Sequence, residues 1–394
     1  MRELALLFLK LGVSAFGGPQ AHIAAINDEA VIRRNWLSAE QFSEAIAVCE
    51  MLPGPASTQV AIYTGYLRGG QWGALVAGIC FIFPAFLIVL VLSWMYFRFQ
   101  GLPQTSALFF GISPVVTAII LGFCWKLGRR IINNRTSVAI AIGVLVITLF
   151  TNVNVLIQFI VAGFLGVYFL GNNKPNARIS GSDNKLILPI LPAIVAEISP
   201  TSLTLSSFWG IERISEFFLP LSWFFFKVGS FIFGGGLVII PLLEFQVVEQ
   251  LHWLTKTEFI NGVAIGQLSP GPVVLTAAFV GYKVAGVMGS IVSTIAIFTP
   301  SFLFIMLAAP LLQKLRQNPQ VRNFLKGVTP AVLGAIAAAA IPLAQTALIQ
   351  ERLSYSIIAT VIFILALIAL IYYRVATWRL ILAGALLGLL VRFV

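Results

Sequence analysis

Long apolar runs, separated by short polar connections, occupy almost the whole chain. They fall at roughly 3–26, 40–66, 72–98, 104–126, 136–150, 153–171, 186–209, 217–243, 258–282, 285–312, 325–349, 353–373 and 377–394. Most are close to the 20 or so residues that a helix needs to cross a bilayer. The pattern predicts an all-α polytopic membrane protein. The runs 136–150 and 153–171 are short and closely spaced, which predicts a tight helical hairpin.

Composition strengthens this prediction and excludes other classes. Of the 394 residues, 59% are hydrophobic and only 10% are charged, whereas soluble domains carry about 25% charged residues. A soluble enzyme, a disordered tail and a nucleic-acid module are therefore excluded. The three cysteines lie in apolar sequence without a CxxC spacing, so we expect core residues and no metal site. The net charge of +11 predicts basic loops against a lipid bilayer, with no nucleic-acid partner.

The chain repeats itself once. In a first register the paired motifs are Lys10 with Lys227, Gly17-Gly18 with Gly234-Gly235, Trp36-Leu37 with Trp253-Leu254, and Pro53-Gly54-Pro55 with Pro270-Gly271-Pro272. After a single slip, a second register pairs Gly65-Tyr66 with Gly281-Tyr282 and Pro84 with Pro300. Two further pairs, Phe42 with Phe259 and Gly111-Ile112-Ser113-Pro114 with Gly327-Val328-Thr329-Pro330, bring the matched motifs to eight. Eight motifs in order predict two homologous repeats of about six segments each. We assign residues 1–171 and 216–394 to the repeats, and 172–215 to a linker with a possible extra span.

The charges of the loops favour opposite orientations for the two repeats. In the first repeat the even-numbered loops carry more Lys and Arg, and in the second repeat the odd-numbered loops do. Since basic residues stay on the cytoplasmic side, this reversal predicts an inverted pair, about thirteen spans, an internal N-terminus and an external C-terminus. The alternative is a parallel pair in which 186–209, which has three prolines and Glu197, lies on the membrane surface.

Glycine and proline interrupt the first two segments of each repeat. The interruptions are Gly17-Gly18-Pro19, Gly234-Gly235-Gly236 and the two Pro-Gly-Pro motifs, 53–55 and 270–272. Non-helical backbone at membrane depth is tolerated where it is buried or lines a cavity, and matched broken helices point to a transporter's central site. Exposed amide donors at such breaks suit an anion. The alternative is a set of packing kinks.

Two lysines hold matched positions inside apolar sequence. Lys10 and Lys227 each precede the Gly-Gly pair of their repeat by several residues. A cation in a membrane segment costs about 2.5–3.5 kcal/mol on insertion scales and is a functional candidate by default. Together the two lysines would offset a divalent oxyanion. The alternative is that the side chains snorkel to the interface, more readily for Lys10, which is near the start of the chain.

Other polar groups near the breaks are weaker candidates. Glu44 and Glu50 precede the first Pro-Gly-Pro motif and could carry a coupling proton, hold a lysine or form a structural ion pair. The hydrogen-bonding side chains beside the breaks are Gln20, Ser57, Thr58, Gln59, Ser269 and Thr276. They could bind oxygens or satisfy freed backbone groups. His22 and His252 are expected to be satisfied core or loop residues. No nucleotide-binding loop or hydrolase motif occurs, so we expect neither enzyme activity nor a cofactor.

At these motifs the sequence resembles the chromate transporter family. The resemblance rests on FGGPQAHIA (16–24), LPGPASTQ (52–59), FGGG (233–236) and SPGPV (269–273), and it covers nearly the whole chain. It implies a multi-pass protein of the bacterial cytoplasmic membrane that exports chromate, with sulfate as a related oxyanion. The repeats differ at Pro19, which is Gly236, and at Leu52, which is Ser269.

The functional prediction is a secondary transporter for a divalent oxyanion. The substrate-binding candidates are Lys10, Lys227, Gly17, Gly18, Gly234, Gly235, Pro53, Gly54, Pro55, Pro270, Gly271, Pro272, Gln20, Ser57 and Ser269. An anion channel and a transporter of another small anion are the alternatives, because a family does not fix its substrate. A membrane-embedded lipid enzyme finds no supporting motif. The sequence leaves the oligomeric state open, with a homodimer possible.

Overall fold

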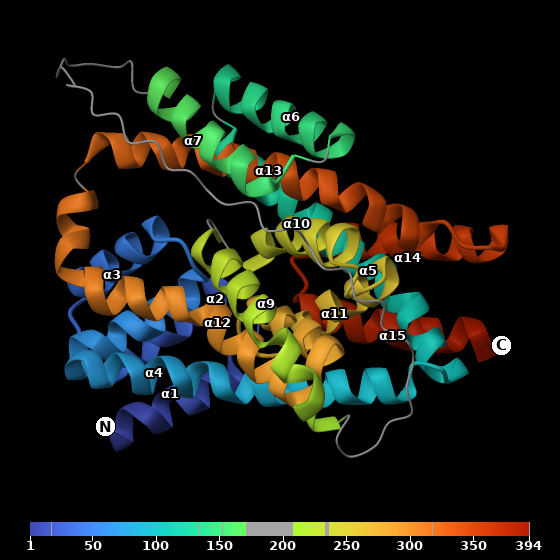
Figure 1. Cartoon of the computed structure of the whole chain (residues 1–394), viewed down its shortest axis with the longest axis horizontal. Coiled ribbons are helices and arrows are strands. Elements are labelled where there is room, and N and C mark those ends of the chain that lie inside the picture. The colour runs from blue at the N-terminus through green and yellow to red at the C-terminus, as the bar shows by residue number, and fades with distance from the viewer. Residues whose placement is uncertain are drawn as a thin grey trace.

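In the computed structural model, residues 1–16, 18–132, 134–151, 153–170, 208–232, 236–316 and 318–393 are described, and every regular element among them is a helix (Figure 1). The first part contains α1 (Arg2–Ser14), α2 (Pro19–Asn27), η1 (Asp28–Arg33), α3 (Ala39–Met51), α4 (Ala56–Phe99), α5 (Pro103–Ile131), α6 (Arg135–Phe150) and α7 (Val155–Leu170). The second contains α9 (Ile211–Ser230), η2 (Gly236–Val238), α10 (Ile239–Leu243), η3 (Glu244–Gln250), α11 (Lys256–Leu268), η4 (Val273–Leu275), α12 (Thr276–Arg316), α13 (Pro319–Leu348), α14 (Leu353–Ile371) and α15 (Thr377–Phe393).

Five described helical segments are long and apolar enough to cross a membrane: Ala56–Phe99, Pro103–Ile131, Val273–Leu307, Pro319–Leu348 and Leu353–Ile371. Three shorter apolar helices accompany them, so the prediction of a polytopic helical membrane protein is confirmed. The predicted hairpin is also confirmed, as α6 and α7. The marginal run 186–209 falls almost wholly outside the described residues.

The same helix boundaries recur in the registers found in the sequence. Helix α3 follows Ser38 and α11 follows Thr255, and each of these residues closes a capping box with the third residue of its helix. Long helices α4 and α12 each kink once, at Gly69–Gly70 and at Ala285–Gly286. Both π-helices, η1 and η3, precede the capped helices by a short loop. Equivalent local sequence therefore builds equivalent local structure.

The first apolar run does not form one continuous span. Helix α1 ends at Ser14, α2 begins at Pro19, and the chain then folds back on itself. The Lys10 ammonium lies 3.1 Å from the Glu29 carboxylate, whereas a straight helix between these positions would separate them by about 28 Å. The first apolar run therefore folds as a hairpin of α1 and α2, which apolar content alone did not reveal.

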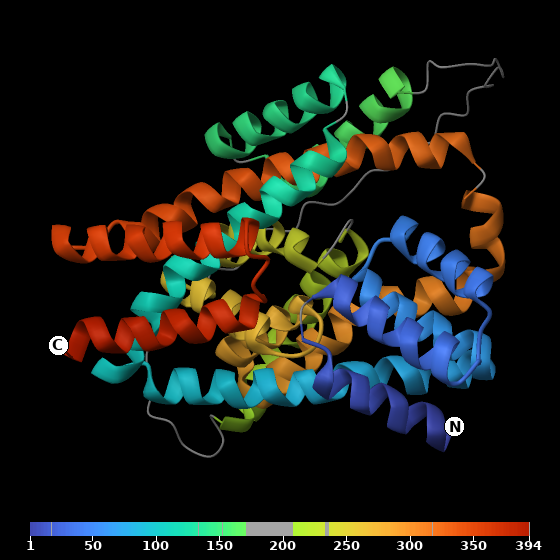
Figure 2. The same cartoon turned by 180° about the vertical axis from the view of Figure 1, so that it is seen from behind.

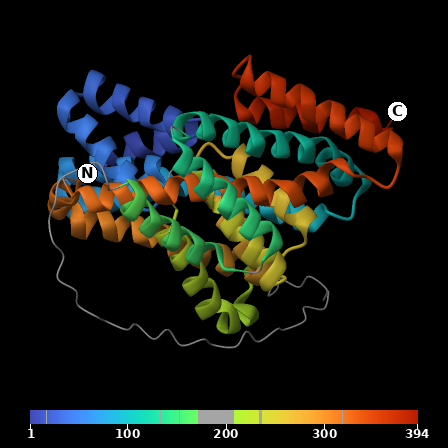
Figure 3. The same ribbon diagram turned by 90° about the horizontal axis from the view of Figure 1, so that it is seen from above.

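The long helices of the two parts interleave. Helix α5 packs against α14 and α15, and its counterpart α13 packs against α6 and α7. Glycines permit close approach of the backbones: Gly111 lies against Gly384 and Gly388, and Gly327 lies against Gly166. Figures 2 and 3 show the N-terminal helices and the α14–α15 pair at opposite ends of the molecule. Each part thus completes its packing with a hairpin from the other.

Candidate functional site

The first Pro-Gly-Pro loop contacts the second part at Ile232, just after α9. The backbone N–H of Gly54 donates to the carbonyl of Ile232, with an N to O distance of 2.6 Å. Gly54 has a φ of +137°, and a Cβ atom there would overlap the side chains of Gln59 and Ser301. The Gln59 amide donates in turn to the Pro53 carbonyl at 2.7 Å. Segments that belong to different repeats therefore share one buried junction.

The second Pro-Gly-Pro loop makes the corresponding contact on the other side. A Cβ atom at Gly271 would overlap the Cβ of Ala85, and one at Gly236 would lie 3.3 Å from Val273. His22 bridges towards this loop: its Nε2 lies 2.7 Å from the Ala15 carbonyl oxygen, and the Pro270 backbone is beside the ring. Because a carbonyl only accepts, Nε2 carries the proton. The interrupted segments of both parts thus converge.

The two sides of this junction differ in polarity. Gly54 packs against Ser301 and Gln59, whereas Gly271 packs against Ala85 and lies near Leu275. In the second register of the repeat, which also pairs Pro84 with Pro300, Ala85 is the counterpart of Ser301. The first Pro-Gly-Pro loop therefore faces hydrogen-bonding side chains, and the second faces an apolar side chain at the equivalent place.

Polar atoms without a hydrogen-bond partner concentrate at the junction. Within the described residues the buried ones are His22 Nδ1, Thr58 Oγ1, Gln59 Oε1, Thr64 Oγ1, Gln267 Nε2 and Ser301 Oγ. Except for Thr64 Oγ1, these atoms belong to residues that lie near an interrupted segment in the sequence or contact its loop. Each such atom costs about 1–3 kcal/mol, so a cluster needs an explanation. Helix α4 also begins at the first loop with no side-chain cap, which leaves amide donors there.

The two lysines are in different environments. Lys10 is exposed and paired with Glu29. Lys227 is half-buried near the end of α9, with its Nζ 6.0 Å from the centre of the Trp223 ring. The counterpart of Glu29 in the second part is Gln246, so no carboxylate occupies the equivalent place. Lys227 takes part in none of the ion pairs between described residues.

The remaining sequence candidates divide between the junction and the surface. Ser57 and Ser269 are buried beside the loops, and the Ser269 hydroxyl donates to the Gly266 carbonyl at 2.9 Å. Gln20, Glu44 and Glu50 are exposed, and Glu50 lies 3.9 Å from the Arg130 guanidinium. Gly17, Gly234 and Gly235 lie outside the described residues.

Glu29 is the hub of an ion cluster that the sequence did not indicate. Its buried carboxylate is within 3.1–3.4 Å of Lys10, Arg33 and Arg34, and Arg34 also pairs with Glu3. The hydrogen bond from Lys10, with that from Arg34, outweighs burial and holds the pKa of the Glu29 carboxyl below its ordinary value. The cluster fastens the α1–α2 hairpin.

Replacing Glu29 by Gln is expected to loosen this hairpin. We expect a loss of about 1–2 kcal/mol in stability, because three cations would lose their common partner. The carboxylate's contribution to the free energy of unfolding is fully present above the pKa that it has in the unfolded chain, about 4.3. This contribution is lost as the pH falls through the lowered pKa of the native state. Unfolding midpoints of the detergent-solubilised protein should therefore differ between the two proteins at pH 7 and converge below about pH 4. Equal midpoints at pH 7 would contradict the assignment.

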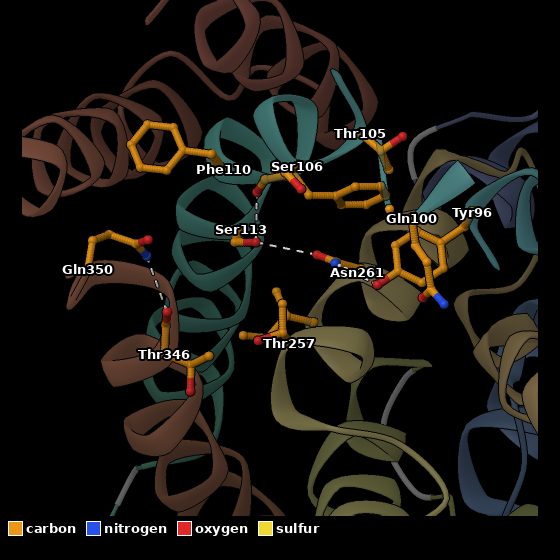
Figure 4. A pocket seen from close by; sticks show the side chains of 13 residues that line it. Tyr96, Gln100, Thr105, Ser106, Phe110, Ser113, Thr257, Asn261, Thr346 and Gln350 are labelled. Atoms are coloured by element: carbon orange, nitrogen blue, oxygen red, sulfur yellow. Dashed lines mark hydrogen bonds between the residues drawn. The ribbon is translucent and has the colours of Figure 1, made fainter. Parts of the chain in front are cut away.

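A separate polar cavity opens at the end of the molecule that holds the α4–α5 and α13–α14 connections (Figures 1 and 4). Its volume is about 420 Å³. The polar lining residues are Tyr96, Gln100, Thr105, Ser106, Ser113, Thr257, Asn261, Thr346 and Gln350. Figure 4 shows Ser113, Asn261 and Tyr96 among the lining side chains, joined by hydrogen bonds. No sequence motif marked this cavity.

Sequence reasoning also missed Ser301 and Ala85, which touch the glycines of the two loops. The signal was present in the repeat, because both residues follow a matched proline, Pro300 or Pro84, and differ in polarity. A search for polar differences between the aligned repeats would have found this position. The spacing of residues within a single repeat would not have revealed this position.

Long apolar helices around a buried junction of broken segments define a multi-pass α-helical membrane protein of the transporter type. The family described as chromate transporter matches residues 2–167 and again residues 219–389. The chain belongs to the chromate transporter family.

Individual relatives agree with this assignment. A chromate transport protein of Cupriavidus metallidurans is 35% identical over 366 residues, covering 93% of this chain and 88% of its own length. A probable chromate transport protein of Synechococcus elongatus is 31% identical, covering 88% and 86%. An uncharacterized transporter of Methanocaldococcus jannaschii is 32% identical, covering 98% and 92%. No solved structure matches the chain.

Proposed function

We propose that this protein is a secondary transporter that exports chromate, or a related divalent oxyanion such as sulfate, across the cytoplasmic membrane. The observation that carries the proposal is the set of unpartnered buried polar atoms where the broken segments meet. An oxyanion accepts hydrogen bonds from hydroxyl, amide and backbone N–H donors, so its binding would satisfy the donors of this set. The choice of chromate as the substrate is based on relatives that are named chromate transport proteins.

The charge balance supports a dianion. Lys227 enters the membrane region without a carboxylate partner among the described residues, and the start of α4 adds the positive end of a helix dipole. An inside-negative potential favours expulsion of a dianion by about 4.6 kcal/mol at 100 mV, twice the value for one charge. Export by this route needs no nucleotide hydrolysis.

Oppositely oriented repeats, 1–171 and 216–394, are part of the proposal. Helices α4 and α12 run in opposite directions along the long axis in Figures 1 and 2. The α5–α6 and α12–α13 connections and the helix ends beside them carry Lys126, Arg129, Arg130, Arg135, Lys314, Arg316, Arg322 and Lys326 in the sequence, whereas the α4–α5 and α13–α14 connections, at the other end in Figure 1, carry Arg98 and Arg352. The richer end would face the cytoplasm. Because α5 and α13 interleave with the other repeat, access would alternate by movement of the broken segments against these long helices.

Transport by purified protein in proteoliposomes tests the proposal. We expect saturable chromate flux that is accelerated by chromate on the opposite side, since counterflow distinguishes a carrier from a channel. Competition with sulfate, molybdate and organic acids would rank the substrates. Flux that rises linearly with concentration and shows no counterflow would support a channel and overturn the carrier. Mass measurement of the solubilised protein would test the homodimer.

Removing the hydroxyl at Ser301 is expected to weaken substrate binding. Ser301→Ala should raise the KM for chromate about fivefold to tenfold, since one hydrogen bond to a charged partner contributes about 1.5 kcal/mol or less here. The matched control is Ala85→Ser, which adds a hydroxyl at the equivalent place beside the second loop. Initial rates in proteoliposomes would measure both. An unchanged KM for Ser301→Ala would exclude the hydroxyl from the site.

A further inference from the structure

The polar cavity differs from a general binding pocket in its charge. Among the described residues that line it there is no acid and no base, although nine of them carry hydroxyl or amide groups. It lies at the end of the molecule with fewer basic residues, beside the α4–α5 connection (Figures 1 and 4). A neutral, donor-rich lining can solvate an anion without holding it tightly.

Several of the repeat-equivalent positions carry charges, of both signs. In the register that pairs Lys10 with Lys227, Thr257 corresponds to Glu40 and Asn261 to Glu44. In the register that follows the slip, Phe110 corresponds to Lys326 and Thr346 to Arg130. These four charged residues are all exposed. The same scaffold therefore carries charges at one end and neutral polar groups at the other.

Asn261 forms the floor of the cavity. It is 3% exposed, donates to the Tyr96 hydroxyl at 3.0 Å and accepts from the Ser113 hydroxyl at 3.4 Å. These bonds tie α11 to α4 and α5. Gln267, whose Nε2 is one of the unpartnered atoms at the junction, follows on the same helix about 9 Å away along the axis.

We propose that this cavity is the outer vestibule through which the anion leaves, with the Asn261 hydrogen bonds as its floor. The inference rests on the proposed export function. Basic residues at the inner end attract the anion from the cytoplasm, the junction binds it, and the neutral vestibule lets it go, since conduction requires weak retention at the exit. This contrast in charge between the two ends favours outward movement of the anion, because capture is faster at the inner end and retention is weaker at the outer end.

The sign of an introduced charge tests this role. Thr257 is exposed at the mouth, so Thr257→Glu and Thr257→Lys are both tolerable in size. We expect Thr257→Glu to lower chromate flux about tenfold and Thr257→Lys to lower it less than about threefold, because only the carboxylate repels the anion. Raising the ionic strength should restore part of the flux of Thr257→Glu. Equal losses in the two variants would overturn the electrostatic role.

Sidedness is tested by thiol labelling, independently of transport. Cys49, Cys80 and Cys124 are free and would first be replaced by Ala. Thr257→Cys should then react with a membrane-impermeant maleimide in right-side-out vesicles, and its counterpart Glu40→Cys should react in everted vesicles. Labelling of both cysteines from the same side would refute the assignment of the cavity to the outer face.

The outcomes separate this inference from the proposed function. Wild-type protein that moves no chromate would overturn the proposed function, whatever the labelling shows. Wild-type flux together with Thr257→Glu and Thr257→Lys variants that both match it would leave the transporter standing and remove the vestibule from its path.

Discussion

Replacing Lys227 by Gln is expected to reduce chromate transport about 10- to 100-fold. A hydrogen bond to a charged group is worth about 1.5–3 kcal/mol when its partner would otherwise lie in a site of low polarity. Lys227 is half-buried, precedes the break of the second part and has no acid partner among the described ion pairs. Under the proposed function, its positive charge would then compensate the dianion. Initial rates in proteoliposomes, corrected for the amount of inserted protein, would measure the effect.

The internal repeat provides matched controls. Lys10→Gln should lower transport less than about fivefold, because an exposed pair contributes about 0–1 kcal/mol and Lys10 is already paired with Glu29. Gln246→Glu should behave like Lys227→Gln, since it places a carboxylate at the counterpart of Glu29. Lys227→Arg should retain most of the flux. Normal rates in both Lys227→Gln and Gln246→Glu would show that Lys227 only reaches the membrane interface beside Trp223.

The local features of this fold could be read from the sequence because neighbouring residues determine them. Apolar length gives the spans, glycine and proline mark the breaks, and Ser38 and Thr255 start capped helices. The motif register gives matching helices and kinks. These signals depend on no distant contact, so the chain reveals them without a structure.

Contacts between distant segments could not be read in this way. Nothing in an apolar helix specifies which other apolar helix covers it, so the packing of α5 on α14 and α15 was hidden. Lys10 looked uncompensated because Glu29 is remote from it in the chain and comes close only through the hairpin. Ser301 escaped notice because its partner, Gly54, lies in the other repeat.

Replacing Gly54 by Ala is expected to abolish transport, with the largest effect of any single substitution considered. An L-residue at the φ of +137° that Gly54 adopts is strained by about 1–3 kcal/mol. Its Cβ would also overlap the side chains of Gln59 and Ser301 and disturb the bond to Ile232. We expect flux below about 1% of wild type, because small displacements of a positioned site cost about 100-fold. Protein levels and monodispersity in detergent would show whether the variant still folds.

Gly271 provides the contrast, because its defect should be repairable. A Cβ there overlaps mainly the Cβ of Ala85, and Gly271 is absent from the described residues with positive φ. Gly271→Ala should therefore reduce flux strongly, and adding Ala85→Gly should restore it to within about threefold, as expected when two contacting residues are energetically coupled. Ser301→Gly should not rescue Gly54→Ala, since the strained backbone and Gln59 remain. Rescue at Gly54 but not at Gly271 would mean that side-chain overlap, and not backbone conformation, constrains the first loop. The two glycines thus hold matched places for different physical reasons: one for its backbone angle, the other for the room that it leaves.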